Sequence, residues 1–224
     1  MARMRKLLHE LYEKLWDRFG PQGWWPGETP FEVALGAILT QNTNWQNVAR
    51  VIDNLKLEGA LDAVILRKMP DAELARRLRP AGYYNIKAAR VKNFLAFFAQ
   101  RHHDSMASMA AEDLGALRAE LLAVKGIGPE TADSILLYAL HKPSFVVDAY
   151  TFRILSRHGL VENPLSYDEL RQVFMEHLPA DVELFQEYHA LLVRVGKEFC
   201  RPRPKCSDCP LFGWPDGSGP AIVE

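Results

Sequence analysis

The sequence has little cysteine, no long apolar run and no strand-like alternation. Only three of its 224 residues are cysteine, and all three lie between positions 200 and 209. Such clustering in a chain otherwise free of cysteine favours metal binding over a disulfide framework. No apolar run approaches the ~20 residues needed to cross a membrane, and the N-terminus has no apolar signal core. A cytoplasmic location without a membrane partner is therefore expected.

An excess of positive charge is also lacking. Lys and Arg number 27 against 28 Asp and Glu, for a formal net charge of −1. This balance is not the signature of a nucleic-acid binder, so affinity for phosphate would have to come from a local basic face. The most basic region lies near the C-terminus and holds Arg194, Lys197, Arg201, Arg203 and Lys205.

Helical periodicity is what the sequence does contain. Apolar residues recur with a period near 3.6 over residues 4–19, and residues 31–41 are apolar almost all round, which predicts a buried central helix. Because β-branched or aromatic alternation is missing, the fold is expected to be all-α. Further helices are predicted at 44–55, 62–68, 71–78, 87–101, 111–123, 130–140, 149–156, 167–177 and 182–196.

The most informative segment is a glycine turn followed by a lone carboxylate. Gly126-Ile127-Gly128 precedes a predicted helix, and Asp148 follows about twenty residues later in apolar surroundings. A Gly-x-Gly turn can lay backbone N–H groups against a phosphate, and the positive end of the next helix favours the same ligand. The turn is therefore a candidate anchor for a nucleic-acid backbone. Asp148 is a candidate N-cap and a candidate catalytic group, and these two roles are compatible.

Five segments together carry a resemblance to a known family. They are KGIGP at 125–129, VVD at 146–148, LTQNT at 39–43, GYYNIKA at 82–88 and the cysteine run at 200–209. In this combination the chain resembles the helix-hairpin-helix (HhH-GPD) DNA glycosylases, the superfamily that includes endonuclease III. The likeness covers roughly residues 10–210.

This resemblance implies a two-lobed fold and a partner. One lobe would be a continuous six-helix domain over residues 30–140 that ends in the helix-hairpin-helix. Residues 1–29 and 141–224 would form the second lobe from the N- and C-terminal helices, with the cysteine loop at 200–209. The expected partner is double-stranded DNA that contains a damaged base, bound by a monomer.

Site roles follow from the same resemblance. The hairpin residues Lys125, Gly126, Ile127 and Gly128 would hold the phosphodiester. Gln41 would fill the gap left by the extruded base, although it could also simply end the helix before it.

The catalytic group expected from the resemblance is Asp148 with Glu130. Loss of a base passes through an oxocarbenium-like sugar, which the Asp148 carboxylate would stabilise while it orients a water. Glu130 stands where bifunctional members carry a lysine that forms a Schiff base with the sugar, and a carboxylate cannot form that imine. Glu130 also suits the first turn of a helix. Its presence favours a monofunctional glycosylase.

Tryptophans supply the remaining clue to the substrate. Trp24, Trp25 and Pro26 lie in a Gly/Pro-rich loop, and Trp45 follows the LTQNT segment. These aromatics either pack on the core or form a pocket whose indole faces stack on an extruded, cationic base. Together, the Trp-Trp-Pro loop at 24–26, the TQNT loop at 40–43 and Glu130 resemble the 3-methyladenine glycosylase branch related to endonuclease III.

The cysteine loop departs from the family pattern. Cys200, Cys206 and Cys209 resemble the ligands of a [4Fe–4S] cluster, but the first gap is one residue short and no fourth cysteine follows. Asp208 or a solvent ligand could complete an iron site, a zinc site is also conceivable, and the loop could lack metal. A cluster with an incomplete cysteine set is therefore a possible cofactor.

The function expected from these observations is hydrolysis of the N-glycosidic bond of a damaged base, an alkylated purine such as 3-methyladenine, in base excision repair. Two alternatives stay open. One is a bifunctional endonuclease III-type glycosylase/AP lyase, which Glu130 opposes. The other is a non-catalytic protein that binds DNA damage, which the retention of Asp148 opposes.

Overall fold

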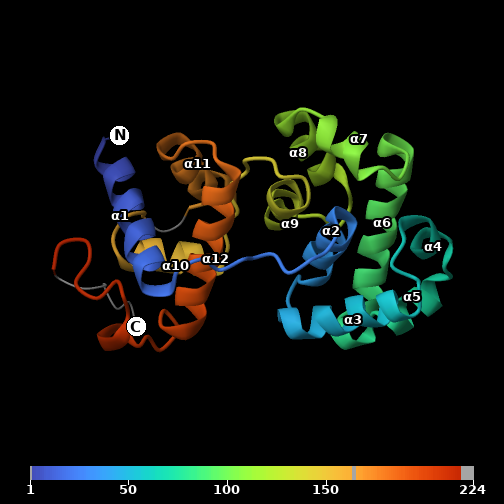
Figure 1. Ribbon diagram of the computed structural model, residues 1–224, viewed down its shortest axis with the longest axis horizontal. Coiled ribbons are helices and arrows are strands. Elements are labelled where there is room, and N and C mark those ends of the chain that lie inside the picture. The colour runs from blue at the N-terminus through green and yellow to red at the C-terminus, as the bar shows by residue number, and fades with distance from the viewer. Residues whose placement is uncertain (1, 163–164, 218–224) are drawn as a thin grey trace. The chain divides into compact units, whose positions relative to one another are not determined.

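Helices joined by turns and loops make up the described part of the chain (Figure 1). The computed structural model describes residues 2–162 and 165–217, and no strand occurs in these ranges. The all-α prediction is confirmed. The longer helices are α1 (Ala2–Phe19), α2 (Pro30–Leu39), α3 (Trp45–Leu57), α6 (Tyr84–His102), α8 (Leu114–Ala123), α10 (Ala149–Arg157), α11 (Tyr167–His177) and α12 (Val182–Glu198). Shorter ones are α4 (Ala63–Lys68), α5 (Asp71–Arg77), α7 (Met106–Ala111), α9 (Pro129–Ser134), the 3₁₀ turns η1 (Arg79–Ala81) and η3 (Cys206–Asp208), and the π-helical turn η2 (Ile135–Ala139).

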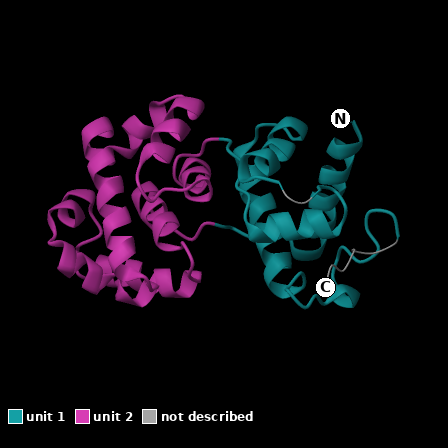
Figure 2. Cartoon of the chain, turned by 180° about the vertical axis from the view of Figure 1, so that it is seen from behind, with its two compact units in different colours: residues 1–24, 143–224 teal, residues 25–142 magenta. Residues whose placement is uncertain are grey.

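The chain divides into two compact units (Figure 2). Unit 1 consists of Met1–Trp24 and Pro143–Glu224, and unit 2 consists of Trp25–Lys142. Unit 1 is therefore assembled from both ends of the sequence, whereas unit 2 is continuous. No helix among the described residues is long and apolar enough to cross a membrane.

Helix α2 is the buried centre of unit 2, as predicted from its composition. Thr29 caps it by accepting a hydrogen bond from the Glu32 N–H, and Pro30 occupies its first position. All residues from 32 to 39 are buried. The helix ends at Leu39, two residues earlier than expected: Thr40 is the C-cap and donates its N–H to the Gly36 carbonyl, and Asn42 then adopts a left-handed φ of +54°. The Gln41 side chain is thereby released from the helix.

Capping residues explain why the boundary predicted at residue 111 is wrong. The helix expected at 111–123 begins at Leu114, because the Asp113 carboxylate accepts hydrogen bonds from the N–H groups of Gly115 and Ala116. A separate short helix, α7, precedes it and is capped by Ser105. Both caps were missed because apolar periodicity is weak over these short turns.

In unit 1, helix α10 packs against α12 at a glycine. A Cβ atom on Gly196 would collide with the Tyr150 ring, so the absence of a side chain lets the two helices approach. Arg153 adds a hydrogen bond of 3.3 Å to the Gly196 carbonyl. Helix α1 also packs on α12, where the buried Tyr188 hydroxyl donates to the Leu8 carbonyl at 2.7 Å. This packing fixes the N-terminal end of α10, where Asp148 lies.

Candidate functional site

The turn between α8 and α9 is a tight hairpin, as the glycine pattern predicted. The Ile127 N–H donates to the Val124 carbonyl at 3.0 Å, and Gly126 adopts φ +98°, which L side chains rarely adopt. Gly128 then caps α9, whose first residue is Pro129.

The two glycines of the hairpin have different surroundings. A Cβ atom on Gly126 would collide with the aliphatic part of Arg90, which closes that side of the turn. A Cβ atom on Gly128 would meet nothing within 4 Å, and its φ of −89° is open to any residue. Nothing in the described protein therefore requires glycine at position 128, and the space in front of it is open.

Gln41 lies beside this hairpin and is bonded to it. Its amide nitrogen donates to the Gly126 carbonyl at 3.1 Å and to the Thr131 hydroxyl at 2.8 Å, and its amide oxygen accepts from Arg90. The loop after α2 and the hairpin are thus joined across 85 residues of sequence. In this structure the Gln41 amide ties together two predicted DNA-contacting segments.

Two charged side chains flank the hairpin. Lys125 is exposed, and its carbonyl accepts a hydrogen bond of 2.9 Å from the Asn93 amide. Glu130 is exposed in the first turn of α9, a position that suits a carboxylate. The hairpin therefore presents one cation and one anion at its surface.

An exposed aromatic residue occurs at the start of α6. Tyr83 is 67% exposed and Ile86 is 53% exposed. Ile86 shares one face of α6 with Arg90, which contacts the hairpin glycine and Gln41. Tyr83 adopts a left-handed conformation with φ +46°, directly after Gly82. Tyr83 belongs to the GYYNIKA segment that carries the family resemblance, but the sequence alone gave it no role at the site.

Trp25 and Trp45 come together in unit 2. Their ring centroids are 5.2 Å apart at an edge-to-face angle of 83°, and Trp25 lies 5.4 Å from the buried Tyr138 ring. Gly36 of α2 makes room for them, since a Cβ atom there would lie 3.2–3.3 Å from both indoles. Both indoles remain half-buried. They are thus core-packed on one side and accessible on the other.

Trp24 and Pro26 have different surroundings. Trp24 belongs to unit 1, where it lines a surface hollow with Gln22, Arg194 and Lys197. Its loop is held on α12 because Glu187 accepts hydrogen bonds from the Gln22 N–H at 2.7 Å and the Gly23 N–H at 3.1 Å. Pro26 is exposed.

Asp148 is the N-cap of α10, which confirms its expected structural role. Oδ1 accepts two hydrogen bonds from Thr151, from the backbone N–H at 2.7 Å and from the hydroxyl at 2.9 Å. Thr151 is fully buried. One carboxylate oxygen is thus held in place, and the other has a different neighbour.

The neighbour of Asp148 Oδ2 is His189 of α12, a residue that belongs to no recognised sequence motif. Its Nε2 lies 3.8 Å from Asp148 Oδ2, and both side chains are largely buried. Burial lowers the pKa of His189, the nearby Asp148 charge raises it, and Lys197 lowers it. Only the packing of α10 on α12 brings this pair together.

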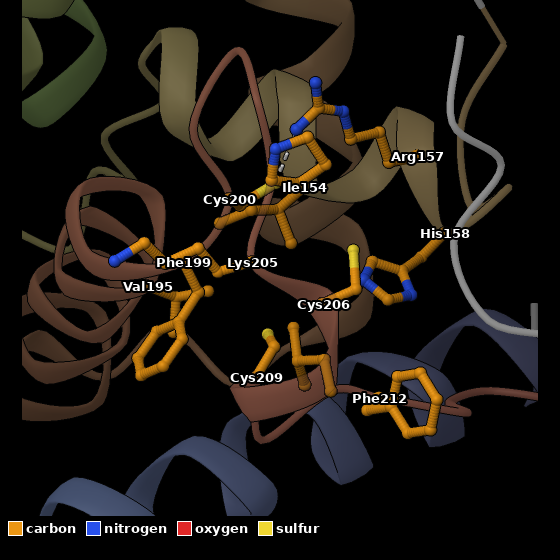
Figure 3. Close-up of a pocket in the computed structure, with 12 residues that line it drawn as sticks. Ile154, Arg157, His158, Val195, Phe199, Cys200, Lys205, Cys206, Cys209 and Phe212 are labelled. Carbon is orange, nitrogen blue, oxygen red and sulfur yellow. Dashed lines mark hydrogen bonds between the residues drawn. The ribbon is translucent and has the colours of Figure 1, made fainter.

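The three cysteines line one cavity in unit 1 (Figure 3). Its apolar wall includes Ile154, Val195, Phe199, Leu211 and Phe212, and its polar lining includes Arg157, His158 and Lys205. Cys200 is buried, while Cys206 and Cys209 are half-buried. The cysteine sulfurs point toward this shared space.

Two arginines of α10 hold the cysteine loop. Arg157 donates to the Cys200 sulfur at 3.4 Å and to the Arg201 carbonyl at 2.7 Å, and Arg153 donates to the Cys200 carbonyl at 2.6 Å. Burial raises the pKa of Cys209, as does the proximity of Cys200 and Cys206.

Burial also lowers the pKa of His158. Within residues 2–162 and 165–217, no group of three or more His, Cys, Asp or Glu side chains is arranged to hold a single metal ion.

Comparison with known proteins agrees with this architecture. The family model of the HhH-GPD superfamily base excision DNA repair proteins matches residues 35–180. A candidate DNA repair glycosylase of Methanocaldococcus jannaschii is 48% identical over 208 residues, which cover 92% of this chain and 94% of that protein.

Two solved structures are also similar. The Helicobacter pylori 3-methyladenine DNA glycosylase bound to 1,N6-ethenoadenine is 29% identical, with a TM-score of 0.74 over 87% of this chain and 97% of that chain. A non-covalent endonuclease III–DNA complex, at 22% identity, shares the fold with a TM-score of 0.79 over 92% of both chains. The chain belongs to the HhH-GPD superfamily of base excision DNA repair proteins and is a DNA glycosylase.

Proposed function

We propose that this glycosylase is monofunctional and hydrolyses the N-glycosidic bond of an alkylated purine, such as 3-methyladenine, in double-stranded DNA. The observation that carries the proposal is Glu130, an exposed carboxylate in the first turn of α9. Cleavage of the strand through a Schiff base needs an amine at this position, and Glu130 supplies none. Water is then the nucleophile.

Asp148 promotes the departure of the base in this proposal. As the bond to the base breaks, the sugar gains positive charge, and a fixed carboxylate stabilises that charge without having to reorganise. The two hydrogen bonds from Thr151 to Oδ1 support such a fixed geometry. Oδ2 is then the oxygen that faces the reacting sugar or orients the water.

The hairpin residues Lys125, Gly126, Ile127 and Gly128 hold the DNA backbone. The open space in front of Gly128 supports this role, because backbone N–H groups bind phosphate best where no side chain intervenes. Lys125 adds a cation at the same turn.

Gln41 and Tyr83 act on the duplex itself. Gln41 fills the gap that the extruded base leaves in the duplex. To do so, its amide gives up its hydrogen bonds to the hairpin and forms hydrogen bonds with the base that has lost its partner. The exposed Tyr83 ring is suited to wedge between bases, as apolar side chains do in proteins that kink DNA.

The aromatic side chains recognise the extruded base. An N3-alkylated purine is cationic, and indole faces attract cations through their ring quadrupole. The half-buried Trp25 and Trp45 supply such faces. Trp24 offers a further indole, and Pro26 offers an apolar ring without π electrons. The likeness to the H. pylori 3-methyladenine glycosylase supports this substrate class.

We also propose that the cysteine loop holds a [4Fe–4S] cluster. Three thiols line one cavity, and the Arg157 hydrogen bond to Cys200 Sγ suits a ligated thiolate. Lys205 in the lining adds positive charge that would balance an anionic cluster. The cluster serves packing and DNA binding in this proposal.

The cellular setting in this proposal is the sequence-based expectation: the protein acts in the cytoplasm as a monomer.

A base-release assay tests the proposed function. The protein is incubated with duplexes that each carry one lesion, namely 3-methyladenine, 7-methylguanine, 1,N6-ethenoadenine, thymine glycol or 8-oxoguanine, and the free bases are separated and quantified. Release of the alkylated purines, with strand breaks only after alkali, is expected. Release of thymine glycol with spontaneous strand cleavage would identify a bifunctional enzyme, and binding without release would identify a damage-binding protein.

A further inference from the structure

We propose that His158 is the fourth ligand of the iron–sulfur site, so that three thiolates and one imidazole hold the cluster. This inference rests on the proposed cofactor and adds a residue from outside the cysteine loop. His158 ends helix α10 and lies 42 or more residues before the cysteines in the sequence. Because His158 lies so far from the cysteines in the sequence, it is not part of the cysteine motif.

The position of His158 is the first argument. Its side chain lines the same cavity as Cys200, Cys206 and Cys209, and Figure 3 shows its ring beside the Cys206 sulfur. The other described side chains that line this cavity are apolar or cationic. Asp208, the alternative expected from the sequence, is exposed and is not part of the lining. His158 is therefore the one additional metal-ligating side chain in the described lining.

The tautomer of His158 is the second argument. Its Nδ1 lies 2.7 Å from the carbonyl oxygen of Trp214. A carbonyl only accepts hydrogen bonds, so Nδ1 carries the proton and Nε2 of the neutral ring keeps its lone pair. Histidines that bind metals through one nitrogen characteristically donate from the other to a carbonyl or carboxylate, which fixes the ring.

The residue that fixes the ring is itself well anchored. Trp214 is 5% exposed, and its ring centroid lies 5.4 Å from that of His158. The Trp214 backbone N–H donates to the Leu211 carbonyl at 3.1 Å, and Leu211 is a buried residue of the cavity wall. The segment after Cys209, in which the family pattern would place a fourth cysteine, thus holds His158 in position through Trp214.

Replacing a thiolate by a neutral imidazole has an electronic consequence. The ligand set carries one negative charge fewer than four cysteines, and the Arg157 N–H···S hydrogen bond withdraws further charge from Cys200. Both effects favour the reduced cluster, so the reduction potential should exceed that of a comparable four-cysteine site.

The test uses the full-length protein purified without oxygen and reconstituted with iron and sulfide. Iron, acid-labile sulfide and visible absorption are measured, followed by pulsed EPR of the dithionite-reduced protein with natural and 15N-labelled histidine. We expect about four irons per chain and a strong 14N coupling that changes to the 15N pattern on labelling. A cluster without this nitrogen coupling would overturn the His158 assignment and leave the cofactor proposal intact.

Two variants of His158 separate ligation from packing. In His158→Asn the side-chain amide can still donate to the Trp214 carbonyl, but no atom replaces Nε2, so loss of iron in air should become at least tenfold faster. His158→Cys should retain the cluster without the nitrogen coupling and with a lower potential. Unchanged iron retention in His158→Asn would contradict the inference, and the labelled wild-type protein decides the question if a variant does not fold. Absence of iron from the wild-type protein would overturn both the ligand and the cofactor, whereas base release by the same metal-free sample would show that the glycosylase function stands separately.

Discussion

Asp148 has two functions that one substitution can separate. Its carboxylate caps α10, and its charge is the proposed stabiliser of the sugar cation. Asparagine caps helices about as well as aspartate, because its amide oxygen accepts the same hydrogen bonds. A change to asparagine therefore removes the charge and keeps the helix.

We expect Asp148→Asn to slow base release by about 10²–10³, the typical loss when one preorganised electrostatic group is removed. DNA affinity should stay within a few-fold, since the backbone contacts are assigned to the hairpin. Single-turnover release and binding of a non-cleavable lesion duplex measure the two effects. Near-normal turnover of a well-folded variant would falsify the catalytic role.

Glu130 determines the type of chemistry. Without an amine at this position, borohydride should trap no covalent enzyme–DNA adduct, and strands should break only after alkali treatment. Glu130→Gln serves as the control and should behave like the wild-type protein in the trapping assay. An adduct that disappears when a single lysine is mutated would refute the monofunctional assignment.

At the scale of elements, the hairpin between α8 and α9 offers a matched pair of glycines. Gly126 is required by its φ of +98° and by the Arg90 side chain, whereas nothing in the described protein requires Gly128. Substitutions at Gly126 and Gly128 can therefore distinguish an effect on folding stability from an effect on phosphate binding within the same turn.

Gly126→Ala should lower the melting temperature, because an L residue is strained at this φ and its Cβ collides with Arg90. Gly128→Ala should leave the melting temperature within about 1–2 °C and weaken duplex binding, because the added methyl group blocks the approach of a phosphate. Thermal unfolding and fluorescence anisotropy distinguish the two. Full DNA affinity in Gly128→Ala would show that the hairpin does not contact the backbone at this residue.

At the scale of the whole molecule, buried histidines link stability to pH in both units. His102 in unit 2 and His189 in unit 1 are buried, and burial lowers the pKa of each below the ordinary value of 6.5. Such a histidine binds fewer protons when folded than when unfolded. Its contribution to stability is therefore complete above pH 6.5 and is lost as the pH falls through the folded pKa.

The melting temperature should accordingly fall as the pH is lowered from 7.5 to 5.5. His102 packs edge-on against Phe97 at 5.1 Å, away from the proposed site, so His102→Phe should remove part of this dependence. For a chain of this size, each kcal/mol lost from the free energy of unfolding lowers the melting temperature by about 2–4 °C. Equal pH slopes for the variant and the wild-type protein would show that His102 does not contribute.

Much of this protein was predictable from the sequence because the relevant signals are local. Helices follow from the 3.6-residue apolar period and from caps, as in α2 with Thr29 and Pro30 and in α10 with Asp148. The glycine turn follows from two residues and their neighbours. These features depend on backbone sterics and hydrogen bonds within one or two turns, so the chain specifies them wherever the segment lies.

Only the tertiary structure decided which distant side chains meet. Gln41 bonds to the hairpin 85 residues away, His189 reaches Asp148 from α12, and His158 joins the cysteines through a hydrogen bond to Trp214. The difference between Gly126 and Gly128 likewise depends on Arg90 of another helix. Each of these contacts depends on how helix faces pack, through glycines such as Gly196 and apolar surfaces shared by many segments. Local periodicity cannot specify that packing, because the same apolar face can pack against several partners.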